Sequence, residues 1–238
     1  AGNAAQGEVA CGQARGKAPH LPVTHIALGR ARLVRGKVEG AETVIRHALK
    51  LAPGEPAALA ALSAVMARRG QTADALRLID EALAVRPDHP RFRLQKARIL
   101  AATGDWPAAE REARQVAASW PWSGGAQRIV AQAALMRGDA AAAIPPAAQA
   151  AALSPEDPEA FALWSEALRL TGQAGQAAQS ARRGLQRHGN AARLHAALGM
   201  ALMAAGAPAD AATALREASR LAPSDQVLAG NLLAALAA

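Results

Sequence analysis

Arginine supplies most of the chemistry that this 238-residue sequence offers. Of its 27 basic residues 23 are arginines, and the formal net charge is +8. A guanidinium group presents a planar fork of N–H donors, which can bind a carboxylate through two parallel hydrogen bonds. Glutamine amides beside it could add contacts to a bound peptide. For this chemistry we single out Arg30, Arg68, Arg91, Gln95, Arg98, Arg128 and Gln132.

Patterns that would indicate catalysis or metal binding do not occur. The sequence contains no phosphate-binding loop, dinucleotide fingerprint or nucleophile elbow. No two of the six histidines stand three or four residues apart, the spacing that places two metal ligands on one helical face. These histidines are His20, His25, His47, His89, His188 and His195. We therefore expect a protein that is not an enzyme and holds neither metal nor cofactor.

Aromatic residues are scarce, which bears on the choice of partner. They make up 3% of the chain and do not alternate with the basic residues, so the sequence argues against nucleic-acid binding. Trp120 and Trp122 flank a proline in a predicted turn, and turns often carry binding residues. We treat both tryptophans as candidates for partner contact. No apolar run is long enough to cross a membrane.

Four sets of residues, here called columns, recur every 34 residues along the sequence. They indicate the repeated elements that position the candidate binding residues. Glycine occupies the first column, at Gly36, Gly70, Gly104, Gly138, Gly172 and Gly206. Five residues later stands an alanine, at Ala41, Ala75, Ala109, Ala143, Ala177 and Ala211. Seven residues before the glycine stands a small residue, at Gly29, Ser63, Ala97, Ala131, Ser165 and Gly199. The fourth column holds Pro53, Pro87, Pro121, Pro155 and Pro223, with Gly189 replacing proline once.

Each column has a physical reason in a helical hairpin. The glycine permits the left-handed backbone that ends a first helix. The two small columns let the paired helices approach closely, and the proline ends the second helix. The register predicts six units, at 22–55, 56–89, 90–123, 124–157, 158–191 and 192–225. Pro145-Pro146 falls inside a predicted second helix, where we expect a kink or a break.

The repeated pattern resembles that of the tetratricopeptide repeat family. The first unit matches it with Leu28-Gly29, Ala41, Ile45, Ala48 and Pro53, and the last with Leu198-Gly199, Ala211, Leu215, Ala218 and Pro223. The usual large residues at unit positions 4 and 11 are mostly absent. The resemblance implies an all-α fold, a right-handed α-solenoid of six 34-residue helical hairpins. It also implies a concave face lined by the first helices, on which the seven polar residues above would lie.

The two ends of the chain differ from the repeats. Residues 1–21 are rich in glycine and lack periodicity, so we expect a flexible leader. Residues 226–238 are predicted to form a capping helix, which repeat arrays need to cover their last apolar face.

Together these observations predict a protein–protein interaction scaffold that binds a peptide or helix of a partner, with acidic residues, in a basic concave groove. The competing interpretation is that the arginines are solvated or paired with acidic residues of the second helices. The lysine and asparagine clamp of some family members is not matched, since Ala64, Arg98 and Gln132 stand where its asparagine would recur. Two other functions stay open: a recognition arm of a larger glycosyl- or sulfotransferase, and an exported pilus or envelope assembly factor. A bacterial cytoplasm or periplasm would suit the sequence equally.

Overall fold

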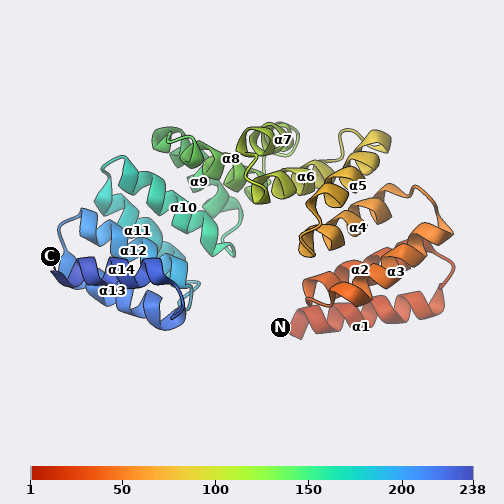
Figure 1. Cartoon of the computed structure of the whole chain (residues 1–238), viewed down its shortest axis with the longest axis horizontal. Helices are drawn as coiled ribbons and strands as arrows, with labels where there is room; N and C mark the ends of the chain where they lie inside the picture. Colours follow the sequence, from red (N-terminus) through yellow and green to blue (C-terminus); the bar gives the residue numbers. More distant parts are fainter. Residues whose placement is uncertain (1, 238) are drawn as a thin grey trace. The chain divides into compact units, whose positions relative to one another are not determined.

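The computed structural model describes residues 2–237, and these form fourteen α-helices with no strand among them. The predicted all-α solenoid of six hairpins with a final capping helix is confirmed. Figure 1 labels the helices in chain order. Their bounds are α1 Gly2–Lys17, α2 Pro22–Val34, α3 Val38–Leu51, α4 Pro56–Arg68, α5 Thr72–Val85, α6 Pro90–Ala102, α7 Trp106–Ser119, α8 Gly124–Met136, α9 Ala140–Leu153, α10 Pro158–Leu170, α11 Ala174–Leu185, α12 Ala192–Ala204, α13 Pro208–Leu221 and α14 Gln226–Ala237. None of these helices is long and apolar enough to cross a bilayer.

The glycine column ends the first helix of every hairpin. Its six members have positive φ angles, from 73° at Gly36 to 83° at Gly104, a region that side chains with a Cβ rarely adopt. In the first hairpin the Lys37 amide then donates to the Arg32 carbonyl at 2.9 Å, and equivalent bonds follow the other five glycines. This bond satisfies a carbonyl that the end of the helix would leave unpaired.

The two small columns lie where paired helices meet. Every alanine five residues after a column glycine is fully buried. In the second hairpin the Ser63 hydroxyl donates to the Ala75 carbonyl at 2.7 Å, and Ser165 donates to Ala177 at 2.9 Å in the fifth. A buried hydroxyl group is thus satisfied by the helix it touches.

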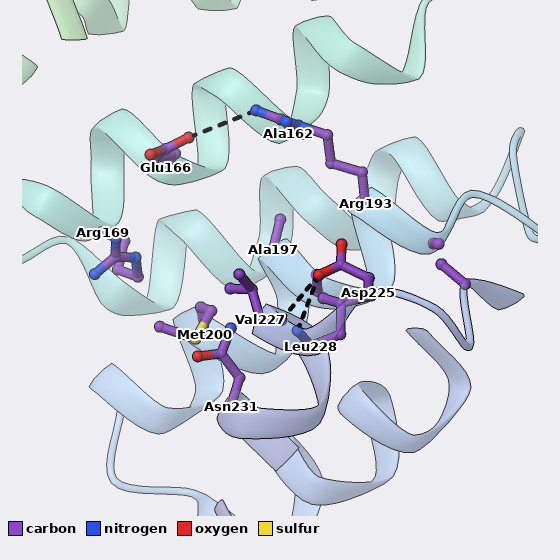
Figure 2. A pocket seen from close by; sticks show the side chains of 13 residues that line it. Ala162, Glu166, Arg169, Arg193, Ala197, Met200, Asp225, Val227, Leu228 and Asn231 are labelled. Atoms are coloured by element: carbon purple, nitrogen blue, oxygen red, sulfur yellow. Dashed lines mark hydrogen bonds and ion pairs between the residues drawn. The ribbon is translucent and has the colours of Figure 1, made fainter. Parts of the chain in front are cut away.

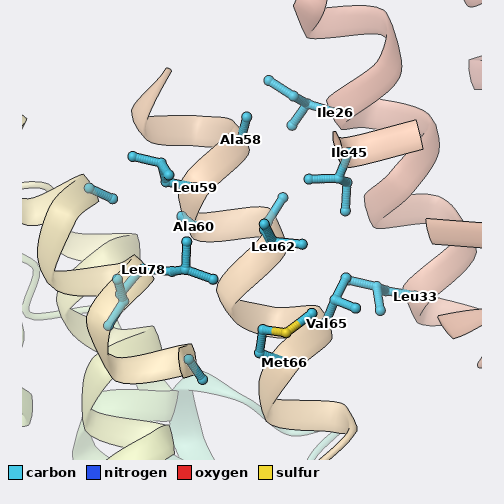
Figure 3. Close-up of a cluster of buried hydrophobic side chains, with 14 of the residues drawn as sticks. Ile26, Leu33, Ile45, Ala58, Leu59, Ala60, Leu62, Val65, Met66 and Leu78 are labelled. Carbon is cyan, nitrogen blue, oxygen red and sulfur yellow. The ribbon is translucent and has the colours of Figure 1, made fainter. Parts of the chain in front are cut away.

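The helices divide into two compact units, the N-terminal unit (residues 1–108) and the C-terminal unit (109–238). In the N-terminal unit, hairpins α2–α3 and α4–α5 pack in sequence, α6 follows, and α1 packs against α2. Figure 3 shows Ile26, Ile45, Leu62 and Val65 of their core, to which Ile79 also belongs.

The C-terminal unit contains hairpins α8–α9, α10–α11 and α12–α13, and each packs against the next. Phe161 and Leu194 belong to one cluster of its core, and Leu202 and Leu215 to another. Helix α14 covers α13 and part of α12, and buries Leu228. Helix α9 continues through Pro145-Pro146, so the sequence expectation of a break there is wrong, whereas the expectation of a kink stays a prediction.

The N-terminal segment corrects one expectation, because residues 2–17 form helix α1 and not a flexible leader. The Glu8 carboxylate accepts a hydrogen bond from Arg35 at 2.6 Å and from Lys37 at 3.0 Å, and it lies 3.5 Å from Arg32. These cations stand at the end of α2 and in the turn after it. Sequence reasoning missed the helix because tertiary contacts, not its glycine-rich composition, hold it in place.

Candidate functional site

The first helices present most of the polar residues singled out from the sequence. In the N-terminal unit these are Arg30 on α2, Arg68 at the end of α4, and Arg91, Gln95 and Arg98 on α6. The four arginines are exposed, whereas Gln95 is half-buried. Gln95 forms hydrogen bonds within the unit, whereas Arg30 and Arg91 lie near each other without a carboxylate partner.

The positive charges of Arg30 and Arg91 affect each other, although α3, α4 and α5 come between their helices in the chain. The Arg30 Nη2 atom donates to the Ala57 carbonyl of α4 at 3.3 Å. Although the Arg30 side chain as a whole is exposed, the loss of water around its guanidinium group lowers the pKa of Arg30, and the charge of Arg91 lowers it further. No carboxylate of the described residues forms an ion pair with either side chain.

His89 adjoins this pair in the turn before α6. Its ring stacks on Phe92 with centroids 3.9 Å apart, and its Nδ1 atom is buried without a hydrogen-bond partner among the described residues. Burial lowers the pKa of His89, and the nearby charges of Arg86, Arg91 and Arg30 lower it further. We call Arg30, Arg86, His89 and Arg91 the cationic cluster.

Sequence reasoning identified only half of the cationic cluster. Arg86 and His89 lie beside the column proline Pro87, in the turn before α6, whereas the polar candidates from the sequence all lie on first helices. The signal that could have found them is the short interval from Arg86 to Arg91, which holds three of the four members.

Gln95 has a structural role in this conformation. Its Nε2 atom donates to the Ala60 carbonyl at 2.8 Å and to the Ser63 hydroxyl at 3.0 Å, which ties α6 to α4. Both amide protons are therefore used within the N-terminal unit.

The candidates in the C-terminal unit are only partly available to a partner. Arg128 on α8 pairs with Asp157 at 3.0 Å between Nε and Oδ2, in line with the competing interpretation of a neutralised arginine. Gln132 on the same helix is half-buried. In the turn before α8, Trp120 is half-buried whereas Trp122 is 66% exposed. Trp122 is thus the more accessible of the two aromatic candidates.

A cavity of about 370 Å³ opens between α10, α12 and the start of α14, and none of the residues singled out from the sequence lines it. Figure 2 shows its wall of small and apolar side chains with Arg169, Arg193, Glu166 and Asp225 at its edges. The first helices of the last two hairpins, which the sequence predicted to line the concave face, supply most of this lining: Ala162, Glu166, Arg169, Arg193, Ala196 and Met200. The repeat register could therefore have located this cavity, but attention to the more basic N-terminal repeats passed over it.

Neither surface contains the ligand set of a metal centre. No group of three or more histidine, cysteine or acidic side chains could hold a metal ion within residues 2–237. The chemistry present is that of guanidinium donors, one perturbed imidazole and apolar surface. Such groups bind anionic and apolar segments.

Comparison with known families and structures identifies similar proteins. Tetratricopeptide repeat models match residues 26–90 and 94–158, more than half of the chain, and a second such model matches residues 66–119. Comparison with curated protein sequences gave no match.

Several solved structures share the fold at low sequence identity. The Cut9 and Hcn1 hetero-tetramer of APC/C contains a chain with a TM-score of 0.87 and 18% identity, covering 99% of this chain and 46% of that one. This chain thus spans less than half of that relative. PilF of Pseudomonas aeruginosa has a TM-score of 0.78 and 20% identity, covering 91% and 96%. YrrB, described as having an unusual peptide-binding site, has a TM-score of 0.61 and 13% identity, covering 78% and 96%.

Proposed function

Because the chain belongs to the tetratricopeptide repeat family, whose members are typically non-enzymatic scaffolds, we propose that its cationic cluster binds an acidic segment of a partner protein. The fold supports protein–protein interaction in general. The cationic cluster supports the finer statement about charge, and one observation carries it. Arg30 and Arg91 lie close enough to lower the pKa of Arg30, yet no carboxylate of the described chain neutralises them.

The cost of this arrangement is the reason to assign it a function. A guanidinium group that loses hydration near a like charge opposes folding, and an ion pair within the chain could relieve it. The chain uses such pairs elsewhere, as between Arg77 and Glu81 at 2.6 Å. Perturbed charged groups without an internal partner are typical of binding sites. A bound carboxylate would supply the missing counter-charge.

A protein segment suits this cluster better than a nucleic acid does. Stacking on bases would require exposed aromatic rings beside the cations, but the nearest ring, Phe92, is buried and stacks on His89. Carboxylates can instead take the planar donors of Arg30 and Arg91 in bidentate fashion. We therefore place aspartate or glutamate side chains of a partner against α2 and α6.

The proposal is tested by capture of partners from a lysate of the source organism with wild-type protein and with an Arg30→Gln, Arg91→Gln variant. We expect partners that only the wild type retains, with cross-linked segments rich in aspartate or glutamate. Each lost guanidinium contact to a carboxylate should cost about 1.5–3 kcal/mol. An Arg46→Gln, Arg77→Gln variant loses the same net charge from second helices and should bind like the wild type.

Two outcomes would reject the proposal. If the two double variants lose the partner to the same extent relative to the wild type, net charge and not the cationic cluster governs binding. Loss of retention after nuclease treatment would assign the cluster to nucleic acid.

The pH dependence of binding gives a second measurement on the identified segment. A bound carboxylate opposes the effects that lower the pKa of His89, so binding should take up a proton. Affinity should therefore rise as the pH falls from 8 toward the lowered pKa of His89, as long as the carboxylates of the segment stay ionised. A His89→Gln variant should lose this slope.

A further inference from the structure

We propose that the cavity between α10, α12 and α14 is a second binding site, which takes an acidic side chain together with a neighbouring small aliphatic side chain of a partner segment. This site lies wholly within the C-terminal unit. It does not depend on the role proposed for the cationic cluster.

The first step of the argument concerns the charges at the edge of the cavity. Arg193 lies 2.9 Å from Glu159 and 3.9 Å from Glu166, so one guanidinium group is shared by two carboxylates. The Asp225 carboxylate accepts hydrogen bonds from the Val227 and Leu228 amides at 3.0 and 3.3 Å, at the first turn of α14. The acidic groups of the cavity therefore have internal partners.

Of the two arginines that line the cavity, Arg169 is the one without a carboxylate partner among the described residues. It stands in the last turn of α10, half-buried, and forms no ion pair with any carboxylate of the described residues. Its neighbour Glu166, one turn earlier on α10, extends toward Arg193 (Figure 2). An entering carboxylate would meet Arg169 without displacing an existing ion pair. The guanidinium group of Arg169 thus favours an acidic side chain at its end of the cavity.

The apolar lining defines the second half of the ligand. Ala162, Ala197, Met200 and Val227 contribute small or flexible surfaces to the wall. A volume of about 370 Å³ lies at the lower end of the range for ligand-binding pockets. It suits a few side chains of a peptide, and methionine adapts readily to aliphatic groups. Figure 2 shows Met200, Asn231 and Arg169 toward the same end of the cavity, so the aliphatic and acidic side chains of the ligand would be neighbours.

Helix α14 therefore does more than cover the last hairpin. Val227, Leu228 and Asn231 form one wall of the cavity, and Asp225 fixes the first turn of that wall through the two amide hydrogen bonds. The amide group of Asn231 offers a further donor to a carboxylate held by Arg169.

The experiment uses methyl NMR on the full chain, because its four methionines include one at the cavity and one in the core of the N-terminal unit. Met200 lines the cavity, whereas Met66 is buried in the core of the N-terminal unit and serves as an internal control. A Met200→Leu variant assigns the signal. The probe is a capped Ala-Val-Glu-Val-Ala peptide, titrated to about 5 mM so that a Kd near 1 mM is visible, beside the same peptide with glutamine for glutamate.

We expect the glutamate peptide to shift the Met200 signal in a saturable manner and to leave Met66 unchanged. The glutamine peptide, and the Arg169→Gln variant with the glutamate peptide, should each bind at least about tenfold more weakly, as expected for a lost charged hydrogen bond. The matched control is Arg182→Gln, which removes an exposed arginine of α11 outside the cavity. Ala196→Leu narrows the cavity and should also weaken binding. It replaces the Arg169→Gln variant as the test if that variant disturbs the fold.

Three outcomes would overturn the inference. If the Met200 signal shows no saturable shift, or shifts equally with both peptides, the cavity does not bind an acidic side chain. Saturation by free glutarate at the same concentration as the peptide would assign the cavity to small carboxylates. The Arg30→Gln, Arg91→Gln variant should keep the Met200 shift, so failure of the cationic cluster and failure of the cavity can be told apart.

Discussion

At the scale of single residues, two glycines without side chains allow the paired helices of the first and last hairpins to pack closely. A Cβ atom at Gly29 would lie 2.4 Å from Ile45 Cγ1, and one at Gly199 would lie 2.5 Å from Leu215 Cγ. Ile45 and Leu215 are fully buried. In the first and last hairpins, glycine therefore makes room for a large residue at the facing position of the second helix.

Gly29→Ala should destabilise the protein by about 1–3 kcal/mol, because the new methyl group overpacks the contact with Ile45. Chemical unfolding of the two proteins measures the difference. The matched control is Gly40→Ala on α3, where a Cβ atom would make an ordinary contact with Arg32 at 3.5 Å. Since alanine favours a helix more than glycine does, this control should gain up to about 1 kcal/mol.

A double variant identifies the contact responsible. Ile45→Ala should cost less stability in the Gly29→Ala background than in the wild type, because it removes the atoms that the new methyl group meets. Equal costs in both backgrounds would place the strain elsewhere.

At the scale of elements, α1 is a helix with several glycines that contacts of one acidic side chain tie to the first hairpin. The helix contains Gly7, Gly12 and Gly16, and a Cβ atom at any of them would meet nothing within 4 Å. Its main polar anchor is Glu8, whose side chain is 11% exposed between three cations of the first hairpin. The hydrogen bond from Lys37 is the largest cause that lowers the pKa of Glu8, and Arg35 contributes as well.

Glu8→Gln should release α1, with faster amide hydrogen exchange in residues 2–17 and unchanged exchange in α4 and α5. Because the pKa of Glu8 is lowered in the folded state, its contribution is present above the ordinary pKa of glutamate and is lost as the pH falls through the lowered value. Added salt should weaken the same contacts.

Glu39→Gln is the control for this prediction, since Glu39 is 83% exposed and lies 3.7 Å from Arg69. It should leave the exchange of α1 unchanged. If the wild-type residues 2–17 exchange as fast as those of the Glu8→Gln variant, the anchoring role of Glu8 is wrong.

At the scale of the whole molecule, the chain consists of neighbouring hairpins with local cores and not of one central core. The residues of the N-terminal unit pack around Ile45, Leu62 and Ile79, and those of α12, α13 and α14 around Leu202 and Leu215. In repeat proteins stability is close to a sum over units and their neighbouring interfaces. Damage to one hairpin should therefore remain local.

Leu215→Ala should cost about 2–5 kcal/mol, because it leaves a cavity at a fully buried position. Hydrogen exchange should accelerate in α12, α13 and α14 while α2 to α5 keep their protection. Ile79→Ala, at the equivalent unit position in the second hairpin, should produce the reverse distribution. Uniform loss of protection throughout the chain in either variant would mean that the array unfolds as one cooperative unit.

The sequence by itself determined the hairpins, because their causes are local and repeat with the chain. A left-handed glycine after each first helix, a small residue where two helices cross and a proline after the second helix act within one 34-residue unit. Their recurrence predicted the all-α solenoid, which the helices confirm.

Only the tertiary structure decided which charges remain unpaired. Arg128 and Arg30 both lie on first helices, yet Asp157 neutralises the former while Arg91 stands near the latter. Contacts between separate elements likewise hold α1 against the first hairpin and form the cavity around Arg169. Charge pairing depends on distances of a few ångströms between side chains from different helices. The repeat period fixes the helices that carry those side chains, but it does not fix these distances.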